Sequence, residues 1–329
     1  MKILVIKLGA KGDVIRTLPI AKALKEKYPN SEICWVTKNN ILDLLRNIVQ
    51  IDKLFSIPFS TSEEFDILYN FDIEDEATSL AIKINAKQKY GFYKNGDYVS
   101  AFNLGGEYYL NTLFDDEIKK TNKKTYQEMM FEVAELSYNK QFMPIVLERS
   151  DLEYAKNFIN KNKINCHKLI GIHMGASPRW PSKIWHEDNL KEFIIKAKNK
   201  GFEILLFAGP DEIERQKKFI DELKLLDIFV YVNSPSNSDG EFASLLNICA
   251  VVVCSDSFAL HLSIALKKKV IGLFFCTPPN EVEDYKLLEK IVSPMLYDFF
   301  PEKMDEYSEE LTKSIKADRV LSAINKENK

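Results

Sequence analysis

The chain has 329 residues and a net charge of −3, with 46% hydrophobic and 28% charged residues. This length predicts two domains of ordinary size, each with enough apolar residues to form a core. The net negative charge disfavours nucleic-acid binding, although a local basic patch still suits an anionic partner. The five cysteines are widely spaced and form no C-x-x-C pair. They disfavour a disulfide framework or a zinc site and fit the reducing cytoplasm.

The apolar segments of the chain are short. The opening run, ILVIKLGA, lacks a cleavage region and is expected to form a first strand rather than a signal peptide. No run reaches the roughly 20 apolar residues that a membrane-spanning helix needs. Any membrane contact is therefore expected to be peripheral.

In the first half of the chain, short β-branched runs alternate with segments of helical periodicity. The expected strands are residues 2–8, 32–38, 53–58 and 65–71. The expected helices are residues 14–27, 41–47 and 126–136. This alternation indicates βαβ units, and hence a parallel sheet with helices on both faces.

The alternation restarts after residue 160. The expected strands are residues 168–174, 203–209, 228–233, 250–255 and 269–275. The expected helices are residues 189–200, 211–223, 241–248 and one after Asp256. Two such halves predict an α/β protein with two Rossmann-like domains and a cleft between them.

We expect the domains to span residues 1–160 and 161–329. The charged segment 148–163 is expected to bridge them. The helical tail after residue 309 is expected to pack back onto either half, the N-terminal domain included.

A glycine-containing turn, Gly9-Ala10-Lys11-Gly12-Asp13, directly follows the first expected strand. Glycines let a ligand approach the backbone, and the start of the next helix favours an anion. The turn lacks the G-x-G-x-x-G spacing of a dinucleotide site, which disfavours a nicotinamide dehydrogenase. Asp13 equally suits a helix N-cap. The position of the turn beyond the carboxyl end of a strand favours a ligand site.

A second turn runs from His173 to Ser177, after another expected strand, and Lys183 follows between Trp180 and Trp185. Gly175 opens the backbone of this turn to a ligand, and Lys183 suits a diphosphate as a point charge. The alternative is a polar loop with an ordinary exposed lysine.

A third polar cluster, Ser255 to His261, follows the apolar run AVVVC and begins a helix. Backbone N–H groups near Ser257 suit a phosphate. The alternative makes Asp256 a helix cap and His261 a buried histidine, and capping does not prevent Asp256 from contacting a substrate.

Three further candidates carry weaker signals. Glu212, in the turn after strand 203–209, suits a ribose as a hydrogen-bond acceptor, although most such acids are solvated. Thr277 either lines the cleft or ends a strand. The segment from Lys87 to Tyr109 mixes lysines, aromatic residues and glycines, which indicates a flexible acceptor-binding loop or an ordinary surface loop.

Together these motifs resemble glycosyltransferase family 9, the ADP-heptose:lipopolysaccharide heptosyltransferases. The family's opening turn, G-D-[VI]-x-x-x-L-P, is matched by Gly12, Asp13, Val14, Leu18 and Pro19. Its H-P-G-A-S turn with K-x-W downstream is matched by His173, Gly175, Ala176, Ser177, Lys183 and Trp185. Its late signature, D-[TS]-G-x-x-H-L-x-x-A, is matched by Asp256, Ser257, His261, Leu262 and Ala265. The similarity spans nearly the whole chain in the same order.

The resemblance implies a GT-B fold, with parallel sheets facing across a central cleft, an N-terminal acceptor-binding domain and a C-terminal donor-binding domain. It implies an inverting, metal-independent glycosyltransferase without a cofactor. Such an enzyme moves heptose from ADP-heptose, a nucleotide sugar, to a lipid-linked lipopolysaccharide or lipooligosaccharide core. The reaction would take place in the cytoplasm, with peripheral contact at the inner membrane.

The resemblance also implies roles for individual residues. Asp13 is expected to act as the general base on the acceptor hydroxyl. The expected donor-binding residues are Gly175, Ser177, Lys183, Glu212, Asp256, Ser257, His261 and Thr277. The expected acceptor-binding residues are Lys11, Gly12 and Arg16. Further basic residues that suit an anionic acceptor are Lys7, Lys22 and Lys25. Closure of the domains is expected to exclude water.

Three positions depart from the family pattern. Met174 replaces a proline, Phe258 replaces a glycine, and Phe275-Cys276-Thr277 stands where the family has G-P-T. The lost glycines leave open a GT-B enzyme with another donor, either a UDP- or GDP-sugar transferase or an epimerase. The third hypothesis is a non-catalytic binding protein derived from a transferase, which would be expected to have lost Asp13, Lys183 or Asp256.

Overall fold

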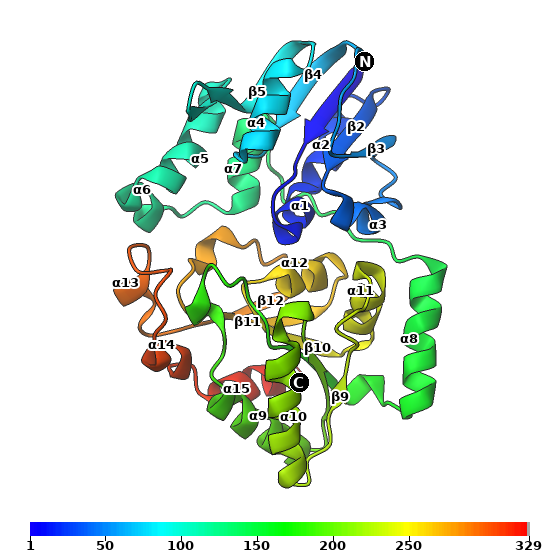
Figure 1. Cartoon of the computed structure of the whole chain (residues 1–329), viewed down its shortest axis with the longest axis vertical. Helices are drawn as coiled ribbons and strands as arrows, with labels where there is room; N and C mark the ends of the chain where they lie inside the picture. Colours follow the sequence, from blue (N-terminus) through cyan, green and yellow to red (C-terminus); the bar gives the residue numbers. More distant parts are fainter. Residues whose placement is uncertain (328–329) are drawn as a thin grey trace. The chain divides into compact units, whose positions relative to one another are not determined.

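The structure is a computed structural model that describes residues 1–327. The chain divides into two compact units. Unit 1 comprises Met1–Val146 and the short segment Asn280–Glu283. Unit 2 comprises Leu147–Pro279 and the chain from Asp284 on. Each unit contains one six-stranded sheet (Figure 1).

The sheet of unit 1 has the strand order β3-β2-β1-β4-β5-β6. Its strands are β1 (Lys2–Ile6), β2 (Glu32–Thr37), β3 (Lys53–Ser56), β4 (Phe65–Asn70), β5 (Ala86–Asn95) and β6 (Tyr98–Ala101). Neighbouring strands are parallel except for β5 and β6, which form an antiparallel hairpin. In the centre, Ile3 of β1 lies beside Ile33 on one side and Ile67 on the other. Buried on both faces, these strands are runs of apolar residues, as parallel strands are.

In unit 1, helices α1 to α4 connect successive parallel strands, and α5, α6 and α7 follow the last strand, β6. They are α1 (Lys11–Thr17), α2 (Pro19–Lys27), α3 (Leu42–Leu45), α4 (Asp75–Lys83), α5 (Leu104–Phe114), α6 (Asp116–Thr121) and α7 (Tyr126–Val133), with a 3-10 turn, η1 (Asn39–Ile41). Helix α7 begins with a capping box formed by Thr125 and Glu128, which places Tyr126 in its first turn. Helix α7 contacts α1, α2 and α5.

The sheet of unit 2 has the order β12-β11-β10-β7-β8-β9 and is entirely parallel. Its strands are β7 (Leu169–His173), β8 (Glu203–Phe207), β9 (Tyr231–Val232), β10 (Val251–Ser255), β11 (Lys269–Phe274) and β12 (Leu288–Val292). Its helices are α8 (Arg149–Asn162), α9 (Glu187–Asn199), α10 (Ile213–Leu225), α11 (Asp239–Ile248), α12 (Phe258–Ala265), α13 (Leu296–Phe299), α14 (Glu309–Lys313) and α15 (Ala317–Glu327). Its 3-10 turns are η2 (Cys166–Lys168), η3 (Pro181–Lys183), η4 (Pro210–Glu212) and η5 (Pro279–Glu281), the last of which runs into the segment that belongs to unit 1.

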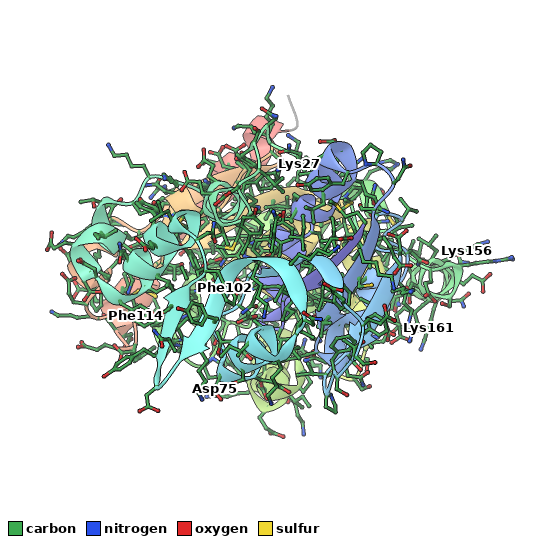
Figure 2. The ribbon with its side chains drawn as sticks, turned by 90° about the horizontal axis from the view of Figure 1, so that it is seen from above. Lys27, Asp75, Phe102, Phe114, Lys156 and Lys161 are labelled. Atoms are coloured by element: carbon green, nitrogen blue, oxygen red, sulfur yellow. The ribbon has the colours of Figure 1, made fainter. Side chains whose placement is uncertain are left out.

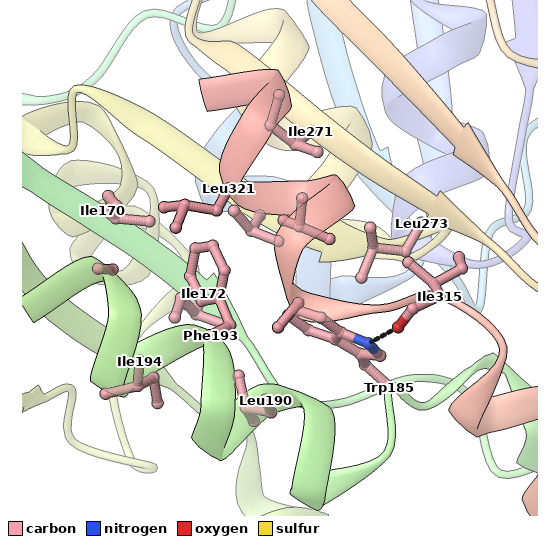
Figure 3. Packing of buried hydrophobic residues seen from close by; sticks show 14 of the residues in the cluster. Ile170, Ile172, Trp185, Leu190, Phe193, Ile194, Ile271, Leu273, Ile315 and Leu321 are labelled. Atoms are coloured by element: carbon pink, nitrogen blue, oxygen red, sulfur yellow. Dashed lines mark hydrogen bonds between the residues drawn. The ribbon is translucent and has the colours of Figure 1, made fainter. Parts of the chain in front are cut away.

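The larger part of the core of unit 2 lies between its sheet and helices α9, α10 and α15 (Figure 3). Leu190 and Phe193 of α9 are buried there against strand residues such as Ile172. The indole Nε1 of Trp185 donates a hydrogen bond of 2.8 Å to the backbone carbonyl of Ile315. This bond satisfies a polar group inside an apolar cluster. It also ties the chain before α9 to the segment before α15.

The expected pair of Rossmann-like halves is confirmed, because both sheets show the order of a doubly wound fold. Three local expectations differ from the structure. Residues 14–27 form two helices rather than one, since Pro19 begins α2 after Leu18. The segment 87–109, expected to be a loop, forms the β5–β6 hairpin and the start of α5.

The third difference concerns the segment expected to bridge the domains. Helix α8 belongs to unit 2 and packs on α11. The two compact units divide between Val146 and Leu147. Ala155 is the buried residue of α8, and Lys156 and Lys161 point outward (Figure 2). The C-terminal helix α15 packs on α9, β11 and β12, and therefore on unit 2.

We predict that Leu190→Ala lowers the free energy of unfolding by about 2–5 kcal/mol, because it leaves a cavity in a core where Leu190 is 2% exposed. The matched control is Leu225→Ala on α10, where the side chain is 88% exposed. The control is expected to change stability by no more than about 0.5 kcal/mol. Urea denaturation followed by circular dichroism measures both, and equal effects of the two variants would contradict the described core.

Candidate active site

In each sheet the strand order reverses direction between two central strands, which are β1 and β4 in unit 1 and β7 and β10 in unit 2. Ligands of doubly wound sheets bind beyond the carboxyl ends of the strands at this point. The three motifs found in the sequence follow β1, β7 and β10. The fold therefore places each of them at such a reversal.

In unit 2 the motifs after β7 and β10 meet in a buried ion pair. Lys183, the last residue of η3, places its Nζ 2.9 Å from Oδ2 of Asp256 and 3.1 Å from the backbone carbonyl of Asp256. His261 of α12 lies on the other carboxylate oxygen, with its Nε2 3.5 Å from Oδ1. The side chains of Lys183 and Asp256 are 11% and 17% exposed.

This pairing decides the charge state of Asp256. Burial by itself would raise the pKa of the Asp256 carboxyl, but Lys183 and His261 hold it well below its usual range. Asp256 is therefore a carboxylate at neutral pH. Within residues 1–327, the Lys183 ammonium donates hydrogen bonds to Asp256 alone. An ammonium has three N–H groups, so one remains for a ligand.

Two hydroxyl groups near the ends of strands in this sheet are buried without a partner in the described part of the chain. They are Oγ of Ser257, after β10, and Oγ1 of Thr277, after β11. Thr277 is 5% exposed. The neighbouring Cys276 lies close enough to Lys183 and Asp256 for their charges to influence its thiol, whose pKa burial raises to about 11. A buried hydroxyl without a partner is costly unless a ligand completes its hydrogen bonds.

Ser257, not Asp256, is the N-cap residue of α12, and no side-chain oxygen caps this helix. The alternative in which Asp256 serves as the cap is therefore wrong. His261 is 8% exposed, as the buried-histidine alternative expects, but its ring faces the carboxylate of Asp256. The start of α12 retains backbone N–H groups that suit an anion.

Gly175 and Glu212, which are far apart in the sequence, lie in direct contact. A Cβ on Gly175 would stand 2.6 Å from Oε1 of Glu212, so a larger residue there would displace the Glu212 carboxylate. Oε2 of Glu212 accepts a hydrogen bond of 2.8 Å from the backbone N–H of Gly209, which fixes the carboxylate at the end of β8. Ser177, by contrast, is exposed and accepts a weak hydrogen bond of 3.4 Å from the N–H of Arg179.

The departures from the family pattern have structural explanations. Met174 and Phe275 are 4% and 0% exposed and belong to the core of unit 2. Phe258 stacks on Phe242, with ring centroids 5.9 Å apart. His173 packs edge-on against the same Phe242, and burial lowers the pKa of His173 to about 4. Its imidazole is therefore neutral at pH 7.

In unit 1, Asp13 lies inside the first turn of α1, whose N-cap residue is Ala10. The capping alternative for Asp13 is therefore also wrong. Arg16 holds Oδ1 of Asp13 through its Nε at 3.0 Å and its Nη2 at 2.7 Å. The guanidinium of Arg16 lies 3.8 Å from the ring centroid of Tyr126, and the Tyr126 hydroxyl lies 3.0 Å from Oγ1 of Thr17.

The expected acceptor residues have different environments. Lys11 is the first residue of α1, and Gly12 is buried behind it. Lys7 is unsuited to an acceptor, because it is 4% exposed and donates to the carbonyl of Phe71 beside Asp72. Lys25 is bound to Asp52 and to the carbonyl of Ser31. These residues precede β3 and β2, so Lys25 lies at the amino ends of the strands, away from the turn that contains Asp13.

Sequence reasoning missed Asp72 and Tyr126. Asp72 follows β4, the strand that adjoins β1 at the reversal. Its position after an apolar strand is the sequence signal that could have identified it. Tyr126 gave no such signal, because its contacts with Arg16 and Thr17 depend on the packing of α7 on α1.

Among the side chains that the structure describes, in residues 1–324, no group of three or more His, Cys, Asp or Glu is arranged to hold a metal ion. In the same part of the chain, no helix has both the length and the apolar character needed to cross a membrane.

The fold and the site define a Rossmann-type protein of two units with a buried Lys–Asp pair at the strand-order reversal of each unit. Residues 61–309, about three quarters of the chain, match glycosyltransferase family 9 (heptosyltransferase). The chain therefore belongs to glycosyltransferase family 9 and is a glycosyltransferase, as its motifs predicted. The matched segment includes Lys183 and Asp256, whereas Asp13 precedes it.

Individual relatives agree with this assignment. The chain is 25% identical to lipopolysaccharide heptosyltransferase 1 of Campylobacter coli over 298 residues, which cover 84% of this chain and 85% of the relative. The crystal structure of a family 9 glycosyltransferase from Veillonella parvula matches with a TM-score of 0.81 at 18% identity, over 99% of this chain and 96% of that one. E. coli ADP-heptose lps heptosyltransferase II matches with a TM-score of 0.71 at 16% identity, over 99% and 98%. At these identities the structural likeness shows the fold, which is of the GT-B type.

We predict that Lys183→Met lowers the free energy of unfolding at pH 7 by about 3–5 kcal/mol, because it leaves the buried Asp256 carboxylate without its main partner. The matched control is Lys191→Met, which breaks the more exposed pair with Glu222 and is expected to cost no more than about 1 kcal/mol.

The pH dependence of this effect follows from the lowered pKa of Asp256. A depressed carboxyl pKa stabilises the fold above the unfolded value of about 3.9 and ceases to do so as the pH falls through the folded value. The difference between wild type and Lys183→Met is therefore expected to be largest at neutral pH and to shrink as the pH falls, because burial raises the pKa of Asp256 once Lys183 is gone and protonation then removes the unpaired charge. Urea denaturation across this range measures it, and a difference that grows on acidification would contradict the pairing.

Proposed function

We propose that this glycosyltransferase moves a heptose from ADP-heptose to a lipopolysaccharide or lipooligosaccharide core acceptor, with inversion at the anomeric carbon and without a metal ion. The observation that carries the proposal is the buried Lys183–Asp256–His261 cluster at the strand-order reversal of unit 2, beside two hydroxyls without partners. The names of the Campylobacter coli relative and of the E. coli structure support the donor and the acceptor class.

The donor diphosphate binds, in this proposal, at the start of α12 and against Lys183. The remaining N–H of Lys183 and the hydroxyls of Ser257 and Thr277 supply donors that bind an oxyanion. These groups offset the charge that develops on the leaving nucleoside diphosphate, which is the role a metal ion plays in other transferases. Asp256, held ionised by Lys183 and His261, accepts hydrogen bonds from sugar hydroxyls.

The nucleoside is proposed to lie toward the carboxyl end of β8. Gly175 leaves the space that the Glu212 carboxylate occupies, and the N–H of Gly209 fixes that carboxylate. A carboxylate held in this way accepts hydrogen bonds from the two hydroxyls of a ribose.

Asp13 acts, in this proposal, as the general base that takes the proton from the acceptor hydroxyl as it attacks the anomeric carbon. A single displacement inverts that carbon and requires one base rather than two carboxylates. Arg16 orients the Asp13 carboxylate, and Lys11 supports an anionic acceptor. The proposed acceptor is lipid-linked, which places the reaction in the cytoplasm at the inner face of the inner membrane.

The donor is tested by thermal shift with ADP, ADP-heptose, UDP, GDP and UDP- and GDP-sugars, because a ligand of the native state raises the melting temperature. We predict a shift with ADP and ADP-heptose alone. A shift with the UDP or GDP compounds instead would replace the donor while keeping the fold. No shift with any compound would favour a non-catalytic binding protein.

The role of Lys183 is tested by titrating ADP into Lys183→Ala in a calorimeter. The expected result is binding at least tenfold weaker than wild type, because one charge-assisted hydrogen bond contributes about 1.5–3 kcal/mol. The matched control, Lys191→Ala, should bind ADP normally. Turnover with and without EDTA tests metal independence, and its loss on chelation would contradict that part of the mechanism.

We predict that Asp13→Asn abolishes transfer to the acceptor and leaves ADP affinity close to that of wild type, since Asp13 belongs to unit 1 and the donor groups belong to unit 2. Turnover with ADP-heptose and a core acceptor measures the first effect, and calorimetry measures the second. A comparable loss of ADP affinity, or retained turnover, would overturn the assignment of Asp13 as the base. The anomeric configuration of the product, read by NMR, tests inversion.

A further inference from the structure

A buried carboxylate holds the loop that leads to Asp13. Asp72, which follows β4, is 3% exposed. Its Oδ2 accepts hydrogen bonds from the backbone N–H of Leu8 at 2.9 Å and from that of Gly9. Its Oδ1 accepts another from the N–H of Glu74 at 3.1 Å. Two consecutive amides of the loop between β1 and α1 are thus bound to one oxygen atom.

Lys7 completes this arrangement from the end of β1. Its Nζ lies 3.3 Å from Oδ2 of Asp72 and donates a hydrogen bond of 3.0 Å to the carbonyl of Phe71. Gly9 covers the pair closely, because a Cβ there would stand 3.0 Å from both Oδ2 of Asp72 and Nζ of Lys7. A side chain at this position would therefore press on the pair beneath the loop, which also binds the loop through the N–H groups of Leu8 and Gly9.

Lys7 and Asp72 are connected to Asp13 through the start of α1 and through the ring of Tyr126. Helix α1 begins two residues after Gly9, and the N–H of Asp13 donates to the carbonyl of Ala10 at 2.8 Å. Nζ of Lys7 and the guanidinium of Arg16 both lie over the ring of Tyr126, at 6.0 and 3.8 Å from its centroid. Arg16 in turn holds the Asp13 carboxylate.

Electrostatics agree with this geometry. Burial opposes the charge on Lys7, yet attraction to Tyr126, Asp72 and Asp13 raises the pKa of Lys7 above its ordinary value. Lys7 therefore stays positive in the interior, close enough to Asp13 for the two charges to interact.

We propose that Asp72 and Lys7 are positioning residues for Asp13, with Asp72 fixing the loop that carries α1 and Lys7 balancing the charge around the Asp13 carboxylate. This inference rests on the proposed function of Asp13 as the base. Neither residue touches the substrate in this proposal, because the pair is buried and bonded to the backbone.

Titratable groups from several elements lie around Asp13. They include Arg16 on the same helix, Lys7 just after β1, Asp72 after β4, and Tyr126 on α7, with Tyr109 of α5 beyond it. Burial raises the pKa values of both tyrosines, which are neutral at pH 7. Removing Lys7 therefore removes a positive charge near Asp13, and removing Asp72 removes a negative one.

These opposite charges allow a test that a merely structural role would not satisfy. We predict that Asp72→Asn lowers kcat about 100-fold, because a base displaced by about 1 Å loses that much. KM for ADP-heptose and the Kd of ADP should stay at wild-type values. The acidic limb of the pH profile of kcat should move to lower pH in Asp72→Asn and to higher pH in Lys7→Met, each by roughly half a unit or more.

Asp52→Asn is the matched control. Asp52 also binds a lysine, Lys25, and a backbone N–H, that of Ile33, but at the opposite edge of the same sheet. Its kcat and pH profile should equal those of wild type. The double variant Lys7→Met/Asp72→Asn leaves no unpaired buried charge, so it serves where a single variant fails to fold. The double variant should show the same loss of kcat as Asp72→Asn. The acidic limb of its pH profile of kcat should lie near that of wild type.

Hydrogen exchange supplies a readout that needs no turnover. The peptide covering residues 7–17 should exchange faster in Asp72→Asn than in wild type, with peptides of unit 2 unchanged. Unaltered exchange, unaltered kcat, or pH limbs that move in the same direction in the two single variants would each overturn the positioning role. If Asp13→Asn itself remains active, the proposed function fails instead, whatever the exchange rates show.

Discussion

The structure depends on the point in each parallel sheet where the strand order changes direction, because the carboxyl ends of two central strands lie side by side there. Each unit places a lysine and an aspartate there, and each pair is largely withdrawn from water. In unit 1 the lysine belongs to the end of β1 and the aspartate follows β4. In unit 2 the lysine comes from the segment after β7 and the aspartate follows β10. These are equivalent strands of the two sheets, so one topological position receives the same pair of charges twice.

The two pairs differ in what surrounds them, and this difference separates their roles. The side chains of Lys7 and Asp72 are 5% and 3% exposed, and backbone groups take up their remaining hydrogen bonds. Such a pair holds the backbone of the loop between β1 and α1 in one conformation. Lys183 and Asp256 are more open, and buried hydroxyls without partners stand on neighbouring strand ends. A buried ion pair contributes little net stability, and the proposed function gives the more open pair a role in binding the donor.

Local patterns in the sequence predicted the central strands of both sheets, because buried parallel strands are apolar runs and the turns after them carry polar residues. They did not predict β5, β6 or β12, which are less apolar and lie toward the ends of the strand order. The same patterns placed Lys183, Asp256 and Asp13 at the correct edge of each sheet. They could not pair Lys7 with Asp72, since the partners are 65 positions apart and a lysine inside a strand resembles a surface residue. Nor could they exclude Asp13 and Asp256 as helix caps, because the cap depends on where the backbone leaves the extended conformation, at Ala10 and Ser257.

The structure also shows which of the residues that depart from the family pattern lie in the core and which lies at a helix terminus. Phe275 and Met174 fill the core beneath the sheet, so their size reflects packing among apolar neighbours. Phe258 is different, because it is the first residue of α12 and stacks on Phe242, which also contacts His173 and Phe207. A ring at the first position of this helix restricts the approach of a ligand to the helix terminus, where a glycine would leave the backbone open. Of these three positions, Phe258 is therefore the one that would affect donor selection under the proposed function, at the helix terminus where that proposal places the diphosphate.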